Sequence, residues 1–99
     1  MAGLPLGFLA ELDALVAQRD ADRPQGSYTT SLFEGGIRRI AQKVGEEGVE
    51  TALAAVAQGG EELLGEAADL LFHLAVLLRA RGLSLADAVA VLARRHAAR

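Results

Sequence analysis

Apolar residues recur every three to four positions through most of this chain, which predicts helices and gives no sign of strands. The first stretch, Leu4 to about Asp20, forms an amphipathic helix in this interpretation. Its apolar face consists of Leu6, Leu9, Leu12, Leu15 and Val16. Pro24 and Gly26 then end the pattern, so a connection is expected there.

A run of hydroxyl residues before Leu32 is typical of a helix N-cap, here of a short helical turn. The run is Ser27-Tyr28-Thr29-Thr30-Ser31. After the interruption at Gly35-Gly36, a long helix is predicted from Gly36 to about Gln58. Its apolar stripe consists of Ile37, Ile40, Ala41, Val44, Ala52, Ala55 and Val56.

Two glycines, Gly45 and Gly48, fall inside this long helix. Each costs about 0.5–1 kcal/mol relative to alanine in a helix interior. We therefore expect another backbone, or a ligand, to approach the helix closely at these positions.

A third helix is predicted from about Glu61 to Arg81, with Gly82 as its C-terminal stop. From Ala67 to Leu78 every residue except Asp69 and His73 is apolar, so this segment should be buried on all sides, with those two residues inside the assembly.

Ser84-Leu85-Ala86-Asp87 resembles a capping box and begins a last helix. The chain is thus expected to be all-α, with four to five helices in a single domain over residues 1–99. The third helix carries more apolar surface than a monomer of 99 residues can cover. A symmetric homodimer, and so a dimeric helical bundle, is the expected assembly.

Composition and charge exclude several classes of function. The net charge is −3, which does not favour nucleic-acid binding. The absence of cysteine excludes disulfides and thiolate chemistry. No apolar run approaches the roughly 20 residues of a membrane span, and no signal peptide is recognisable, so a cytoplasmic location is expected.

The candidate chemistry lies in two rows of acidic residues. At about 100° per residue, Glu46, Glu47 and Glu50 share one arc of the long helix. Glu66 and Asp69 stack one turn apart on the next helix. If the rows face each other, their mutual repulsion calls for a hard cation, and Mg²⁺ is the expected one. A solvated acidic face is the alternative, but a charge at Asp69 in an otherwise apolar helix favours a metal site.

A carboxylate site for Mg²⁺ is suited to a polyphosphate substrate. A carboxylate that does not bind the metal can orient or deprotonate a water molecule. Arg39 and Lys43 could neutralise phosphate charge, although ordinary pairing within the helix is the alternative for both. His73 could be a ligand or a phosphate contact, or a satisfied core group. The aromatic residues Phe33, Phe72 and Tyr28 are better explained as core than as base-stacking platforms, although both interpretations stay open for Tyr28 because it lies in a polar loop.

Two strings of residues resemble a known family. Glu46-Glu47-x-x-Glu50 followed by Glu66-x-x-Asp69 is similar to the metal-binding pattern of the all-α nucleoside triphosphate pyrophosphatases, the MazG-like superfamily. The string from Arg39 to Thr51, with its Ser27-Tyr28-Thr29 lead, resembles the phosphoribosyl-ATP pyrophosphatase branch, as does Asp69-Leu70-Leu71-Phe72-His73-Leu74. The resemblance covers roughly residues 6–96.

The resemblance implies Mg²⁺-dependent hydrolysis of phosphoribosyl-ATP to phosphoribosyl-AMP and pyrophosphate, in histidine biosynthesis, by a homodimer. It assigns the metal to Glu47, Glu50, Glu66 and Asp69. The residues and the resemblance together predict catalytic roles for Glu46, Glu47 and Lys43. They predict substrate binding by Ser27, Tyr28, Thr29, Arg39, Lys43 and His73. Some family members are fused to the cyclohydrolase that acts next, and no such domain is expected here, since the chain has no cysteine or histidine cluster.

Two alternatives remain open at this point. The same metal site would serve a housekeeping pyrophosphatase that acts on noncanonical or deoxy nucleoside triphosphates. A non-catalytic helical dimer or a metal-storage bundle is the other, although the Glu-x-x-His pair of di-iron bundles is absent. Phe33-Glu34 matches no family string and is a candidate for substrate selectivity.

Overall fold

The computed structural model describes residues 5–98, and within that range it contains helices and no strand. The elements are the 3₁₀ turn η1 (Pro5–Gly7) and the helices α1 (Phe8–Asp22), α2 (Tyr28–Gly35), α3 (Ile37–Ala57), α4 (Gly60–Ala80) and α5 (Leu85–Ala97). The all-α class predicted from the sequence is confirmed.

The first predicted helix begins later than expected. Leu4 lies outside the described residues, and the α-helix proper begins at Phe8, after η1. Gly7 occupies the N-cap position and has no side chain to cap the helix. At the other end, α1 runs to Asp22 and stops at Arg23, which adopts a left-handed conformation with φ of 46°.

The hydroxyl run caps α2 as predicted, because the Ser27 side chain accepts a hydrogen bond from the Thr30 amide. What was expected as a short turn is a helix of eight residues. Gly36 then separates α2 from α3 with φ of +90°, a conformation that favours glycine. One residue thus reverses the chain between these two helices.

The boundaries of α4 and α5 follow the predicted signals. Gly82 has φ of +74°, its amide bonds Arg79 O, and the Leu83 amide bonds Leu78 O, which is a Schellman ending. Ser84 and Asp87 form the predicted capping box of α5.

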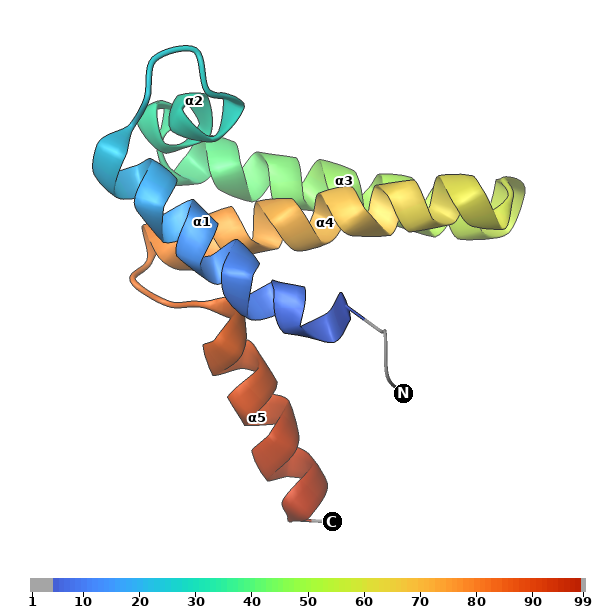
Figure 1. Ribbon diagram of the computed structural model, residues 1–99. Coiled ribbons are helices and arrows are strands. Elements are labelled where there is room, and N and C mark those ends of the chain that lie inside the picture. The colour runs from blue at the N-terminus through green and yellow to red at the C-terminus, as the bar shows by residue number, and fades with distance from the viewer. Residues whose placement is uncertain (1–4, 99) are drawn as a thin grey trace.

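A carboxylate from α1 adds to the cap of α5. Asp13 accepts hydrogen bonds from the amides of Leu85 and Ala86, at 2.9 and 3.0 Å. The first turn of α5 is therefore tied to α1, while the rest of α5 projects away from the other helices (Figure 1).

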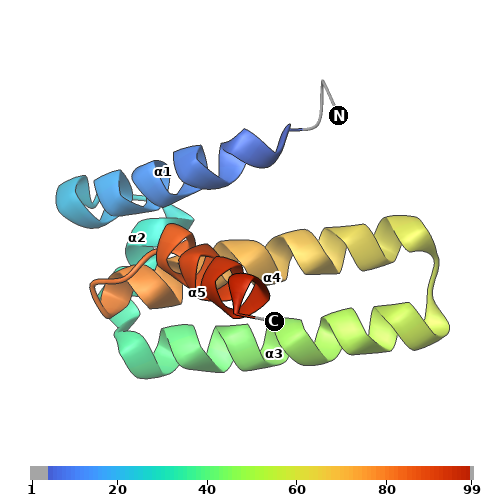
Figure 2. The same ribbon diagram turned by 90° about the horizontal axis from the view of Figure 1, so that it is seen from below.

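Helices α3 and α4 form a long antiparallel hairpin, and the other helices gather at one end of it (Figure 1). Figure 2 shows α4 lying between α1 and α3, with α2 at the end of the hairpin opposite the turn that joins α3 to α4. Among residues 5–98, therefore, no third helix lies over the far end of the hairpin.

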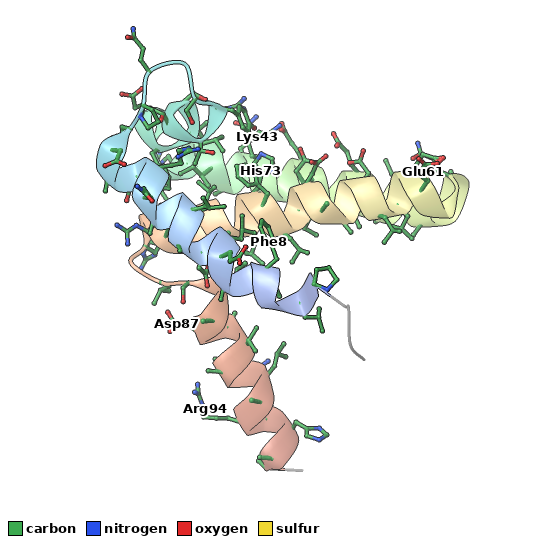
Figure 3. All side chains as sticks on the ribbon, in the orientation of Figure 1. Phe8, Lys43, Glu61, His73, Asp87 and Arg94 are labelled. Carbon is green, nitrogen blue, oxygen red and sulfur yellow. The ribbon has the colours of Figure 1, made fainter. Side chains whose placement is uncertain are left out.

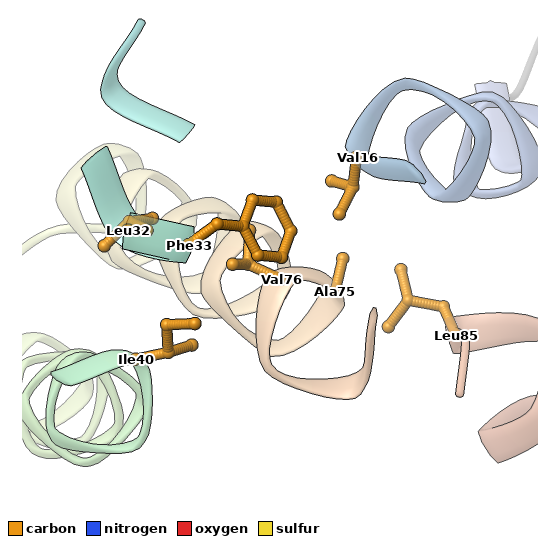
Figure 4. Packing of buried hydrophobic residues seen from close by; sticks show 7 residues of the cluster. All are labelled: Val16, Leu32, Phe33, Ile40, Ala75, Val76 and Leu85. Carbon is orange, nitrogen blue, oxygen red and sulfur yellow. The ribbon is translucent and has the colours of Figure 1, made fainter. Parts of the chain in front are cut away.

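The hydrophobic core lies where the five helices meet (Figure 4). Its buried members are Val16, Leu32, Phe33, Ile40, Ala75, Val76 and Leu85. Each helix contributes at least one of them, so burial of these side chains fixes α1, α2 and α5 on the hairpin.

The predicted apolar stripe of α3 is only partly buried in the single chain. Ile40 is buried, whereas Ile37, Ala52 and Val56 are exposed, and Val56 is 87% exposed. The reason is the arrangement of the helices, because nothing in residues 5–98 covers the outer part of the hairpin.

Two further expectations about the hairpin fail in the single chain. A Cβ atom added at Gly45 or Gly48 would meet nothing within 4 Å, so no part of residues 5–98 approaches these glycines closely. Burial of α4 is one-sided, because His73 is buried while Asp69 and Leu71 are exposed. Any cover for these positions has to come from outside residues 5–98.

Candidate metal and substrate site

Three of the predicted metal ligands meet between the two hairpin helices. Glu47 on α3 and Glu66 and Asp69 on α4 each offer a carboxylate oxygen, and these atoms lie within 4.8 Å of one another. Antiparallel packing places Glu47 opposite the pair on α4, and the three-residue spacing puts Glu66 and Asp69 on one face. Of the first predicted acidic row, therefore, Glu47 faces the second row, whereas Glu46 and Glu50 do not join the cluster.

The buried carboxylate oxygens in this cluster lack partners. Glu47 is 6% exposed, and neither its Oε2 nor the Oε2 of Glu66 has a hydrogen-bond partner in the described chain. A buried unpaired carboxylate is unfavourable, and a cation removes that penalty. Oxygen ligands of Mg²⁺ lie about 2.1 Å from the ion, hence at most about 4.2 Å apart, so the cluster needs only small side-chain movements to fit one.

Lys43 lies at the edge of the cluster and makes two ion pairs. Its Nζ is 3.4 Å from Glu47 Oε1 and 3.6 Å from Glu46 Oε1. Partial burial lowers the pKa of Lys43, but the Tyr28 phenol, Glu47 and Glu46 outweigh that effect and raise the pKa above 10.5 overall. Lys43 is therefore positively charged at any physiological pH.

Glu46 is an exposed carboxylate beside the cluster. Gln42 Nε2 donates a hydrogen bond to Glu46 Oε2 at 3.0 Å. This bond, together with the nearby Lys43 and Arg39 charges, holds the pKa of Glu46 below 4.5 against a smaller opposing effect of desolvation. Glu46 is ionised at neutral pH and remains accessible to solvent.

Glu50 and Arg39 also lie outside the cluster. Glu50 is exposed and is not among the three carboxylates that converge. Arg39 is also exposed, and its side chain runs beside Gly35 at the start of α3. In the described chain, therefore, Glu50 contributes no oxygen to the cluster, and Arg39 contributes charge near Glu46.

Both ring nitrogens of His73 are used within the protein. Nδ1 lies 2.7 Å from the carbonyl oxygen of Asp69, and Nε2 lies 2.8 Å from the Tyr28 hydroxyl. The ring is 4% exposed and makes edge contacts with Tyr28 and Phe72. This favours the alternative that His73 is a satisfied core group over a direct contact with substrate.

A cavity of about 680 Å³ lies beside the start of α2. It is lined by Arg23, Gln25, Gly26, Ser27, Tyr28, Thr30, Ser31 and Glu34. Of the predicted substrate contacts, Ser27 and Tyr28 line it, whereas Thr29 does not.

Arg23 was not singled out from the sequence. Its guanidinium lies over the Phe33 ring and pairs with Asp20 at 3.0 Å. A charged residue just before Pro24 and Gly26 was the available signal, but the left-handed turn that directs it toward the cavity is not visible in a hydrophobic pattern.

Comparison with known proteins decides the family. The sequence matches the phosphoribosyl-ATP pyrophosphohydrolase family over residues 9–96. The chain belongs to this family. The resemblance drawn from the Arg39–Thr51 string and its Ser27-Tyr28-Thr29 lead is confirmed.

Curated relatives of this chain are longer proteins. It is 74% identical over 92 residues to the histidine biosynthesis bifunctional protein HisIE of Xanthomonas campestris, covering 93% of this chain and 45% of the relative. The HisIE protein of Shewanella oneidensis is 56% identical over 89 residues, covering 90% and 42%. The chain thus spans less than half the length of these relatives.

In residues 5–98, none of the helices is both long enough and apolar enough to cross a bilayer.

Proposed function

We propose that this chain hydrolyses phosphoribosyl-ATP to phosphoribosyl-AMP and pyrophosphate in histidine biosynthesis. Membership of the phosphoribosyl-ATP pyrophosphohydrolase family supports the reaction, and the names of the relatives support the pathway. The observation that carries the proposal is the meeting of Glu47, Glu66 and Asp69, with two buried carboxylate oxygens left unpaired. A catalytic domain over residues 1–99 is part of the proposal.

The cluster would hold Mg²⁺ through Glu47, Glu66 and Asp69, with Glu50 as a further ligand after a change of side-chain conformation. When bound, the ion supplies positive charge to a polyphosphate and acidifies a bound water. Glu47 and Lys43 are paired across the edge of the cluster, so Lys43 is placed to neutralise phosphate oxygens on the same side.

Glu46 is our candidate to accept a proton from the attacking water, because it is exposed, lies beside the cluster and is not one of the three converging carboxylates. Its lowered pKa keeps it ionised at neutral pH, and so able to take up a proton. Ser27, Tyr28 and Thr29 would bind substrate at the first turn of α2, with Arg39 adding positive charge. The water adds to phosphorus, the phosphoanhydride bond breaks, and pyrophosphate leaves with its electron pair.

A homodimer is also proposed, because the outer half of the hairpin (residues 48–68) is apolar and uncovered. Its exposed members include Val49, Leu53, Val56 and Leu64, of which Leu53 is 59% and Leu64 is 72% exposed. A second copy packed there would bury these side chains and would cover Asp69 and the open faces of Gly45 and Gly48.

The test is pyrophosphate release from phosphoribosyl-ATP, with and without Mg²⁺, beside a panel of deoxy and noncanonical nucleoside triphosphates. We expect turnover of phosphoribosyl-ATP to be Mg²⁺-dependent and preferred over the panel. Asp69→Asn should lower kcat/KM at least 100-fold with the helical content kept. Glu50→Gln should have a smaller effect, since Glu50 lies outside the cluster in the described chain.

The assay also decides between the alternatives. Preference for a deoxy or noncanonical triphosphate would establish the housekeeping reaction instead. No turnover of any nucleotide, together with no heat of Mg²⁺ or nucleotide binding in a calorimetric titration, would leave a purely structural role. Full activity in both Asp69→Asn and Glu50→Gln would remove the metal site from the mechanism.

A further inference from the structure

A chain of hydrogen bonds joins the start of α2 to the metal-binding helix α4. It runs from the Tyr28 hydroxyl to His73 Nε2, and from His73 Nδ1 to the carbonyl oxygen of Asp69. Tyr28 stands directly after the N-cap Ser27, and Asp69 supplies a carboxylate to the cluster. This series of hydrogen bonds therefore begins in the proposed substrate-binding turn and ends at the backbone of a proposed metal ligand.

The direction of each bond follows from the acceptors. A carbonyl oxygen can only accept, so His73 Nδ1 carries the ring proton. In the neutral ring Nε2 is then an acceptor, and the Tyr28 hydroxyl donates to it. The imidazole thus has one defined tautomer, and Tyr28 has one defined hydroxyl direction.

Packing holds this arrangement in place. The Tyr28 ring stacks on Phe72, with centroids 6.2 Å apart and planes 28° apart, and meets the edge of His73 at 5.7 Å. Tyr28 is 52% exposed nonetheless, whereas His73 is 4% exposed. A half-exposed aromatic residue is thus fixed by a buried partner rather than by its own burial.

The surroundings place this pair at the site. The Tyr28 phenol is close enough to Lys43 to raise the pKa of that side chain, and Lys43 contacts Glu47 of the cluster. In Figure 3, Lys43 and His73 are both labelled near the α2 end of the hairpin, whereas Glu61 lies at its opposite tip.

We propose that His73 is a positioning residue that, through Tyr28, holds the substrate-binding turn at the start of α2 at a fixed place beside the metal cluster. The inference rests on the proposed function, since it concerns how substrate and metal are brought into register. His73 itself need not touch the substrate, which agrees with the use of both its ring nitrogens.

Substitutions can remove one bond of the chain at a time. Tyr28→Phe keeps the ring stacked on Phe72 and removes only the hydroxyl. His73→Asn keeps a donor near the position of Nδ1, and His73→Gln keeps an acceptor near the position of Nε2. Gln18→Ala is the control, because Gln18 Nε2 donates to Asp22 on α1, and neither residue lines the cavity or contacts His73.

The readout is KM and kcat for phosphoribosyl-ATP, or for whichever nucleotide of the panel the wild type cleaves. Tyr28→Phe and His73→Asn should each raise KM about fivefold, the factor expected for one neutral hydrogen bond, with kcat within twofold. His73→Gln and Gln18→Ala should leave KM within twofold. The double variant Tyr28→Phe/His73→Asn should again raise KM about fivefold, since both changes break the same bond.

If His73 were merely structural, its variants would have a lower melting temperature, and the KM of every variant would equal that of the wild type. That result would overturn the proposal. Additive effects of about 25-fold in the double variant, or His73→Gln as impaired as His73→Asn, would overturn the proposal.

The tautomer provides a reading that does not depend on catalysis. Nitrogen-15 NMR of the imidazole should show His73 with the proton on Nδ1, while the exposed His96 serves as the internal reference. A proton on Nε2 of His73 in the wild type would overturn the inference whatever the assays show. An inactive wild type with the Nδ1 proton in place would count against the proposed function alone.

Discussion

Glu66 illustrates how a single residue can be better suited to a ligand than to the isolated chain. One of its carboxylate oxygens is buried without a hydrogen-bond partner in the described residues, and Glu47 shares that property. Unlike Glu47, Glu66 has no ion pair with a lysine or arginine in residues 5–98. Its charge therefore destabilises the metal-free protein until a cation is bound.

Replacing Glu66 with glutamine should separate stability from activity. We expect Glu66→Gln to raise the free energy of unfolding of the metal-free protein by about 0.5–1 kcal/mol, because it removes a buried charge. The same substitution should lower kcat/KM at least 100-fold. Urea unfolding with and without Mg²⁺ measures the first effect, and Mg²⁺ should stabilise only the wild type. Glu61→Gln, at the exposed tip of the hairpin, is the control, and a loss of activity there equal to that of Glu66→Gln would contradict the site.

At the scale of the residue, the sequence predicts a site made of carboxylates better than it predicts which carboxylates belong to that site. Spacings of three and four residues correctly place acids on facing sides of two helices. Which of them meet depends on the register of the hairpin and on side-chain conformations, neither of which periodicity specifies. For that reason Glu47, Glu66 and Asp69 converge, while Glu46 and Glu50 stay in solvent.

At the scale of the elements, α1 and α4 are joined by a carboxylate held between two guanidinium groups. Asp20 on α1 lies 3.0 Å from Arg79 on α4 and 3.0 Å from Arg23 at the end of α1. Desolvation alone would raise the pKa of Asp20, but the hydrogen bonds and charges of Arg23 and Arg79 outweigh it and lower the pKa below 3.8. The pair therefore contributes to the position of α1 over the core.

This ion pair predicts a pH-dependent part of the stability. Because the folded-state pKa is depressed, the contribution of Asp20 is fully present above about pH 4 and is lost as the pH falls through the folded-state pKa. Asp20→Asn should lower the free energy of unfolding by about 0.5–1 kcal/mol at pH 7, with the difference from wild type closing below pH 3.8. Urea unfolding across pH measures it.

The neighbouring Asp22 offers the matched control. It lies in the last turn of α1 and bonds only Gln18, so Asp22→Asn removes the same charge without breaking an ion pair of the described chain. A difference that stays constant with pH in Asp20→Asn would show that the pair with Arg79 is not the cause.

The ends of helices could be predicted from the sequence where a recognisable capping residue is present. Ser27, Gly82 and the Ser84–Asp87 box all act as expected. The hydrogen bonds from the start of α5 to Asp13 could not be predicted. They join residues far apart in the sequence, and their donors are backbone amides, which every residue except proline has.

At the scale of the whole molecule, the hydrophobic core and helices α1, α2 and α5 lie at one end of the α3–α4 hairpin. The other end has exposed apolar side chains. A two-helix hairpin cannot bury both faces alone, and three or more elements normally share a core. Sequence analysis predicted this excess from the apolar length of the third helix, but not that it would fall on the outer half of the hairpin.

A charge placed on this surface should dissociate the proposed dimer. We expect the wild type to be a dimer at micromolar concentration by analytical ultracentrifugation, and Leu53→Glu to shift it toward monomer by at least tenfold in the dissociation constant. Leu92→Glu on α5 is the control, since Leu92 is similarly exposed (62%) but lies outside residues 48–68. A monomeric wild type, or an effect of Leu92→Glu alone, would contradict the proposed interface.

The reversal at Gly36 makes the chirality of a single residue matter. Its φ of +90° and ψ of 169° are the mirror image of an ordinary extended L-residue, and a Cβ there would meet no atom within 4 Å. L-alanine should therefore destabilise the protein by about 1–2 kcal/mol through backbone strain alone. D-alanine, introduced by chemical synthesis, should stabilise it by about 0.4–1 kcal/mol by restricting the unfolded chain. The two stereoisomers have identical composition, yet the L-alanine variant should have a lower melting temperature than the natural protein and the D-alanine variant a higher one.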